Sequence, residues 1–132
     1  MSMIGIGIDV VPVERMEQLL TRHGVVVLVA AISTYRAVRD EVRERVCAGG
    51  DFVEVHVRCS LEELTRRDVK GLYAKALRGE IANFTGVSDP YEAPLDPEIV
   101  VDSELESVDE SVARLVALLE NRGIVSAEEV AA

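Results

Sequence analysis

The chain has 132 residues and a mass of 14.4 kDa, a size that predicts a single domain over residues 1–132. With 48% hydrophobic and 29% charged residues, its composition is that of a globular protein and excludes disorder over the whole length. The longest apolar run, residues 25–32, is too short to span a bilayer, and no basic-then-apolar leader opens the sequence. These features predict a cytoplasmic protein that does not cross a membrane.

The net charge of -10 is unevenly distributed along the chain. Residues 1–88 carry 12 acidic and 12 basic side chains, whereas residues 89–132 carry 12 acidic side chains and two arginines. Because an acidic segment repels phosphate backbones and anionic lipids, we expect neither a nucleic-acid partner nor a membrane surface. Five basic residues lie within residues 66–78, including both lysines of the chain, so a phosphate is expected to bind there.

The first half of the chain predicts strands that alternate with helices. A strand is expected over residues 3–11, followed by a helix that begins at Pro12 and ends before Gly24. The unbroken apolar run 25–32 is rich in β-branched residues and predicts the central strand of a parallel sheet. Valines at four-residue spacing predict an amphipathic helix over residues 35–47, and alternation predicts a strand over residues 52–57.

The second half contains two capping boxes, which mark helix starts. Ser60 with Glu63 predicts a short helix, and residues 70–78 predict another. Residues 83–97, interrupted by a glycine and three prolines, predict a long loop of the kind that is usually functional. A strand is expected over residues 99–101, a helix over 107–122 and a tail over 125–132. Alternating strands and helices predict an α/β fold around a mostly parallel sheet.

Few residues outside the basic segment have the spacing of a chemical motif. No Gly-x-x-x-x-Gly-Lys-Ser/Thr phosphate loop occurs, since both lysines lie in the basic segment. Asp9, at the end of the first predicted strand, is a candidate metal ligand or, equally, a helix N-cap. His23 and His56 lack partners at ligand spacing, so neither is expected to act as a base or ligand. Cys47 and Cys59 are expected to be buried free thiols.

Two segments contain candidate ligand-binding residues. Ser33 and Arg36 follow the predicted central strand and precede a helix, where α/β sheets bind ligands and backbone amides hold anions. Phe84 lies in the proline-rich loop that follows the basic segment, so a nucleotide could place its phosphates on the cations and its base on the ring. The equal alternative is a solvated basic face, with Phe84 anchoring the core.

Residues 24–124 resemble the C-terminal two thirds of the adenylylsulfate kinases, which are P-loop kinases. The matching strings are VVVLVAAISTYRAVRDEVRERV, GDFVEVHV, LEELTRRDVKGLYAKALRGEIANFTGVSDPYEAP and PEIVVDSELESVDESVARLVALLENRGI. Within them KGLY, FTG and DPYEAP follow one another at the family's spacing. The resemblance implies a three-layer P-loop-kinase-like α/β fold, truncated because the P-loop is missing. It implies the family reaction of sulfate assimilation, phosphoryl transfer from MgATP to the 3′-hydroxyl of adenosine 5′-phosphosulfate (APS).

The same resemblance implies a role for individual residues. Ile32 and Ser33 would contact the sulfonucleotide, and Phe84 would stack on its adenine. Arg67 would lie near the base of ATP, and a mobile lid over both nucleotides would contain Lys70, Gly71, Leu72, Tyr73 and Lys75. Because kinases of this family are commonly dimers, a homodimer is expected.

Residues 1–23 instead resemble the opening strand and helix of small holo-acyl-carrier-protein synthases, through the string MIGIGIDVVPVERMEQLL. Asp9 would there match a magnesium ligand. This segment would be a foreign β-α unit, with residues 4–10 pairing beside residues 25–31, and the chain alone would be inactive. The alternatives are a non-catalytic sulfonucleotide-binding or dimerisation module and a fragment of a holo-acyl-carrier-protein synthase.

Overall fold

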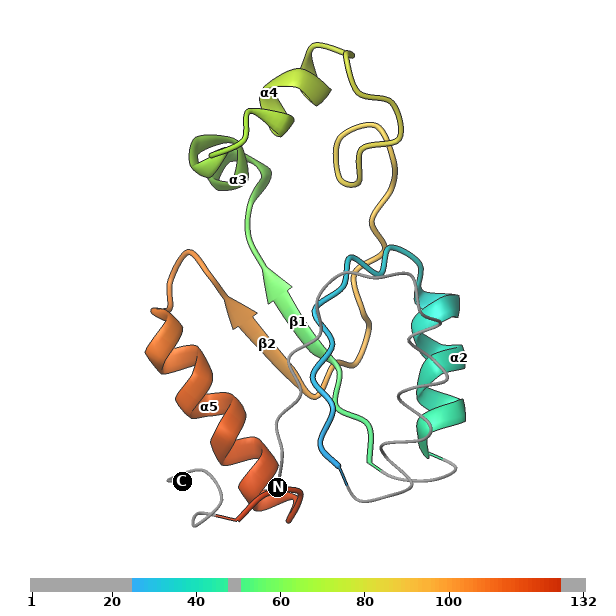
Figure 1. The fold of residues 1–132 in the computed structure, drawn as a ribbon, viewed down its shortest axis with the longest axis vertical. Helices are drawn as coiled ribbons and strands as arrows, with labels where there is room; N and C mark the ends of the chain where they lie inside the picture. The colour runs from blue at the N-terminus through green and yellow to red at the C-terminus, as the bar shows by residue number, and fades with distance from the viewer. Residues whose placement is uncertain (1–24, 48–50, 127–132) are drawn as a thin grey trace. The chain divides into compact units, whose positions relative to one another are not determined.

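The structure is a computed structural model that describes residues 25–47 and 51–126. Its elements are, in chain order, α2 (Arg36–Cys47), β1 (Val55–Arg58), α3 (Leu61–Arg67), α4 (Leu72–Leu77), β2 (Ile99–Asp102) and α5 (Val108–Asn121) (Figure 1). The chain divides into two compact units, one formed by Met1–Val53 with Arg114–Ala132 and the other by Glu54–Ala113. The strand and helix predicted before Gly24 lie outside the described residues, as do Asp9 and His23.

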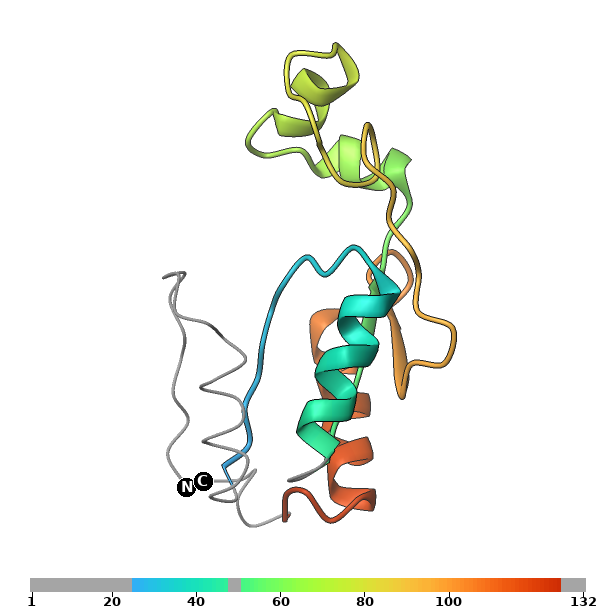
Figure 2. The same cartoon turned by 90° about the vertical axis from the view of Figure 1, so that its right-hand side faces the viewer.

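The sheet of the described residues consists of β1 and β2, which run parallel with Val55 opposite Ile99 and Arg58 opposite Asp102. Alternate residues of β2 are buried, and Ile99 and Val101 contribute to the core. Helices α3 and α4 lie beyond the C-terminal end of β1, and the chain then returns to the start of β2 (Figures 1 and 2). The prediction of a parallel α/β arrangement is therefore confirmed, although β1 begins three residues later than predicted.

The predicted central strand over residues 25–32 is wrong, because residues 25–35 form neither helix nor strand. Leu28, Val29 and Ile32 are exposed, Ile32 to 80%. A strand requires a ladder of hydrogen bonds to a neighbouring strand, and apolar composition does not specify that neighbour. The partner predicted for this run, residues 4–10, lies outside the described residues.

The two longest helices of the described residues, α2 and α5, form where the sequence predicts them. Helix α2 begins one residue after the predicted start and ends at the predicted Cys47. At the start of α5, Ser107 Oγ accepts the Glu110 N–H at 3.2 Å, and the Glu110 carboxylate accepts the Ser107 N–H at 2.8 Å. This reciprocal capping box holds the pKa of Glu110 below its ordinary value, chiefly through the Ser107 amide. Gly123 follows the helix with φ +67°, the conformation that ends many helices.

The expectation of buried thiols is wrong: Cys47 is exposed and Cys59 is half-buried, both as free cysteines. Val46 takes the buried position at the end of α2, and successive helical side chains point about 100° apart, so Cys47 turns toward solvent. Within the described ranges no helix is long and apolar enough to cross a membrane.

Candidate functional site

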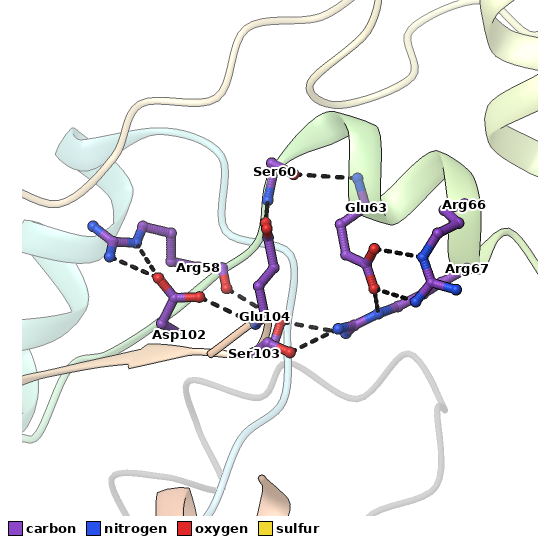
Figure 3. Close-up of polar contacts among 8 residues, drawn as sticks. All are labelled: Arg58, Ser60, Glu63, Arg66, Arg67, Asp102, Ser103 and Glu104. Atoms are coloured by element: carbon purple, nitrogen blue, oxygen red, sulfur yellow. Dashed lines mark hydrogen bonds and ion pairs between the residues drawn. The ribbon is translucent and has the colours of Figure 1, made fainter. Parts of the chain in front are cut away.

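The C-terminal ends of β1 and β2 carry a cluster of charged side chains, at the edge where parallel α/β sheets bind ligands (Figure 3). Arg58 donates to Asp102 Oδ2 from Nε at 3.0 Å and from Nη2 at 2.7 Å. The Arg58 guanidinium, helped by the Glu104 amide, holds the pKa of Asp102 below its ordinary value. The ends of both strands are thus joined by a side-chain ion pair as well as by the backbone ladder.

The residues that follow β2 also bind the segment between β1 and α3. Ser103 donates to the Arg58 carbonyl from its N–H at 3.0 Å and from its hydroxyl at 3.2 Å. The Glu104 carboxylate accepts the Ser60 N–H, a contact that lowers the pKa of Glu104. Because these contacts join residues more than 40 positions apart in sequence, they fix where α3 begins relative to the sheet.

Helix α3 begins with half of the predicted capping box. Ser60 Oγ accepts the Glu63 N–H at 3.2 Å, as predicted. The reciprocal contact is absent from this helix start, because the Ser60 N–H donates to Glu104 and the Glu63 carboxylate turns to two arginines. The helix start is therefore fixed by the end of β2, a partner that local sequence does not reveal.

Glu63 is the centre of a three-residue ion cluster on α3 (Figure 3). Arg66 donates to its carboxylate from Nε and Nη2, both at 2.6 Å, and Arg67 donates from Nε. These contacts lower the pKa of Glu63 to about 2 and raise that of Arg66. Arg67 also donates to the Ser103 carbonyl at 2.7 Å, so its guanidinium is held from two sides.

We expect Glu63 to make stability depend on pH. The folded pKa of about 2 lies below the ordinary 4.5, so its stabilising contribution is complete above pH 4.5 and is lost as the pH falls toward 2. Glu63→Gln lacks this contribution at every pH. The melting temperatures of the unsubstituted chain and of Glu63→Gln, measured by circular dichroism, should therefore converge on acidification. The matched control is Glu62→Gln, which removes an exposed neighbour outside the cluster; a constant gap for Glu63→Gln across this range would contradict the prediction.

The lid residues implied by the resemblance begin at a turn organised by Asp68. The Asp68 carboxylate accepts the Leu72 N–H at 2.8 Å and the Ala74 N–H at 2.9 Å, and the Ala74 contact is the main reason for its lowered pKa. Gly71 has φ +66°, a left-handed conformation that glycine adopts without strain. The turn replaces the predicted first residues of the helix, so α4 begins at Leu72 instead of Lys70. Sequence reasoning missed Asp68, although an aspartate shortly before a helix is a common N-terminal signal.

The basic segment separates into paired and unpaired cations. Arg66 and Arg67 bind Glu63, and Arg78 binds Glu80 at 2.6 Å. Among the residues that the structure describes, no acidic side chain pairs with Lys70 or Lys75, and both lysines are exposed. The two lysines are consequently the charges of this segment that an anionic ligand could neutralise without displacing an existing ion pair.

The structure places Phe84 next to Tyr73, one of the residues that the resemblance assigns to a lid. Their ring centroids lie 5.0 Å apart at an interplanar angle of 77°, an edge-to-face arrangement, and both residues are half-buried. The loop between α4 and β2 has no helix or strand, as predicted, but contains an isolated bridge between Thr85 and Asp89. Within the unit Glu54–Ala113, the Phe84 ring therefore contacts Tyr73 on α4, the helix that also carries Lys75.

The candidates Ile32, Ser33 and Arg36 belong to the other compact unit. The Ser33 carbonyl accepts a hydrogen bond from Arg39 Nη1 at 2.5 Å, so the segment before α2 is anchored to that helix. Ile32 is largely exposed. Their approach to Phe84 stays a prediction, as does metal binding by Asp9.

His56 and the acidic side chains form no metal centre in the parts of the chain that the structure describes. His56 stacks on Tyr91, with ring centroids 6.1 Å apart and planes at 28°. Within residues 25–47 and 51–126, no group of three or more histidine, cysteine, aspartate or glutamate side chains is arranged to hold a metal ion.

Comparisons with known proteins give consistent results. A family model described as Adenylylsulphate kinase matches residues 8–102, so the match begins within the segment predicted to be foreign. The adenylyl-sulfate kinase of Picosynechococcus sp. is 52% identical over 108 residues, which cover 82% of this chain and 59% of the relative. The crystal structure of APE1195 is similar with a TM-score of 0.72 and 44% identity, covering 83% of this chain and 62% of that one.

A second solved structure is that of the APS kinase CysC of Mycobacterium tuberculosis in complex with AMPPNP and APS. It aligns with a TM-score of 0.66 and 35% identity, covering 87% of this chain and 70% of that one. The chain spans about three fifths of the length of the curated relatives that it matches. These similarities confirm the predicted P-loop-kinase-like α/β fold class. Because the family model, the curated relatives and the solved structures all agree, this chain belongs to the adenylylsulphate kinase family.

Proposed function

We propose that this chain binds APS and an adenine nucleotide as part of a cytoplasmic adenylylsulfate kinase of sulfate assimilation. The reaction is transfer of the terminal phosphoryl group of ATP to the 3′-hydroxyl of APS. The M. tuberculosis relative, whose structure is a complex with AMPPNP and APS, supports this assignment of ligands. Since the chain covers about three fifths of its curated relatives, the proposal concerns the contribution of these residues to the reaction.

The observation that carries the proposal is the aromatic and cationic cluster around α4. Phe84 meets Tyr73 edge to face, and α4 with its preceding turn carries Lys70 and Lys75, which have no acidic partner among the described residues. An aromatic ring beside unpaired cations matches the chemistry of a nucleotide, whose base stacks and whose phosphate or phosphosulfate is anionic. We assign base stacking to Phe84 and charge neutralisation to the two lysines.

The remaining predicted residues would complete the nucleotide contacts. Arg67 presents a guanidinium held by Glu63 and Ser103, a preorganised donor for the ATP side. Ile32, Ser33 and Arg36 would contact the sulfonucleotide at the start of α2. Magnesium would enter with ATP, as part of the substrate. Phosphoryl transfer depends mainly on positioning and charge stabilisation, so these residues would act by binding and orienting both nucleotides.

The second candidate function is a non-catalytic sulfonucleotide-binding or homodimerisation module. It rests on the same cluster, since Phe84 with Tyr73 and the two lysines could bind a sulfonucleotide without taking part in its chemistry. Such a module would keep the contacts around Phe84 and would lack the lysine that reaches the transferred phosphate. Titrations with APS and with MgATP on the same preparation distinguish the two functions, because only the first function requires a site for a second nucleotide.

The test is a calorimetric titration of the chain with APS, with and without MgATP. Charge-assisted contacts and ring stacking favour binding, whereas ordering of the loop opposes it, so we expect a dissociation constant of about 0.1–1 mM, or about 4–5.5 kcal/mol. Adenosine 5′-monophosphate is the comparison ligand, since it keeps the base and lacks the sulfate. Absence of heat at millimolar APS, in either condition, would refute the proposal.

A further inference from the structure

The loop that carries Phe84 is closed around the backbone of this residue. The Phe84 carbonyl accepts the N–H groups of Val87, Ser88 and Asp89 at 3.1, 2.9 and 3.0 Å. The Gly86 N–H donates to the Asp89 carbonyl at 2.8 Å, and Gly86 has φ +80° at the tip. Convergence of three amides on one carbonyl makes residues 84–89 a compact turn instead of an extended loop.

Ser88 binds both polar groups of the Phe84 backbone. Its Oγ accepts the Phe84 N–H at 2.8 Å, while its own N–H donates to the Phe84 carbonyl at 2.9 Å. The preceding residue, Asn83, has φ +56°, a left-handed conformation that asparagine tolerates better than most residues. The peptide on each side of Phe84 is therefore fixed, and the direction of its Cα–Cβ bond is fixed with it.

The Phe84 ring is then oriented by one aromatic neighbour. Tyr73 on α4 meets it at 5.0 Å between centroids and 77° between planes. A ring that is held by its backbone and by one edge-to-face contact is preorganised to stack on a planar ligand, which lowers the entropy cost of binding.

We propose that Ser88 is a positioning residue for APS: through the hydroxyl contact with the Phe84 N–H, it sets the ring on which the adenine stacks. This inference rests on the proposed function. Loss of the hydroxyl should not unfold the turn, because the three amides on the Phe84 carbonyl remain. The freed N–H lies at the surface, where water can bind it, so the effect falls on the orientation of Phe84.

The first experiment compares APS affinity among serine variants by calorimetry. Ser88→Ala should raise the dissociation constant about 3- to 5-fold, and Ser88→Thr, which restores a hydroxyl, should return it to within about twofold. Ser111→Ala is the matched control, because Ser111 lies on α5 outside the turn and its hydroxyl contacts Glu106. An unchanged dissociation constant for Ser88→Ala, or equal losses for both alanine variants, would overturn the inference.

A double-mutant cycle shows whether Ser88 acts through Phe84. In the Phe84→Ala background, Ser88→Ala should cause no further loss of APS affinity, whereas a general structural role would add its own loss. Amide hydrogen exchange at Phe84 should accelerate in Ser88→Ala and remain unchanged in Ser111→Ala. Unaltered exchange would overturn the inference without any ligand being present.

The failure of this inference is distinguishable from the failure of the proposed function. If Phe84→Ala weakens APS binding and Ser88→Ala does not, the positioning role fails and the proposed function stands. If APS does not bind the unsubstituted chain, or if Phe84→Ala leaves its affinity unchanged, both fail together.

Discussion

The 132-residue chain, incubated with ATP, magnesium and APS, should form no 3′-phosphoadenosine 5′-phosphosulfate above background. A lysine placed on the transferred phosphate and backbone amides around it provide much of the charge stabilisation in P-loop kinases. Both lysines of this chain, Lys70 and Lys75, belong to the segment around α4, and no phosphate-binding loop motif precedes either of them. Loss of a single preorganised donor costs about 10²- to 10³-fold in rate, so we expect turnover at least about 10³-fold below that of a kinase with this loop.

The measurement is release of ADP coupled to detection of the sulfonucleotide product by chromatography. The adenylyl-sulfate kinase of Picosynechococcus sp., 52% identical over the matched region, is the positive control in the same buffer. APS binding without turnover is the expected result, because these residues bind and orient the nucleotides and contain no phosphate-binding loop. Product formation that increases linearly with protein concentration would show that these residues catalyse the reaction alone, and that the sequence motif was the wrong criterion.

Local signals predicted the helices more accurately than the strands. The capping box of Ser107 and Glu110 involves residues three positions apart, so the sequence contains both partners, and α5 begins where they predict. The apolar run 25–32 has the composition of a buried strand, yet no strand forms there, because strand formation depends on a distant partner. Strand β1 illustrates the same limit. Its first and last residues are those that pair with β2, 44 residues later, and they differ from the ends predicted by the alternation of apolar and polar residues.

The candidate site was predictable to the extent that its contacts are local or belong to a recognised motif. The resemblance singled out the KGLY and FTG strings as separate candidate segments, and the structure brings their residues Tyr73 and Phe84 into contact. Asp68 and Ser88 were not identified, because each acts on backbone amides that become its partners only in the folded turn. The role of Glu104, which takes the Ser60 N–H from the capping box, likewise depends on a contact across 44 residues.

Replacing Phe84 should weaken APS binding more than any other single substitution in the turn. The ring is half-buried and already meets Tyr73 edge to face, so an adenine would find it oriented. Ring stacking contributes about 0.5–1.5 kcal/mol beyond the burial of area, so Phe84→Ala should raise the dissociation constant for APS about 3- to 10-fold. Calorimetry measures this change directly, with thermal unfolding to show that the variant is folded.

Two further variants separate stacking from simple burial at this position. Phe84→Tyr keeps the aromatic face and should bind APS within about twofold of the unsubstituted chain, whereas Phe84→Leu keeps apolar bulk without the ring and should recover only part of the loss. His23→Ala should leave the affinity unchanged, because no ligand contact is assigned to that residue. Equal affinities for APS in the alanine, leucine and tyrosine variants would mean that the base does not stack on Phe84. The aromatic contact with Tyr73 would then serve only to hold the loop against α4.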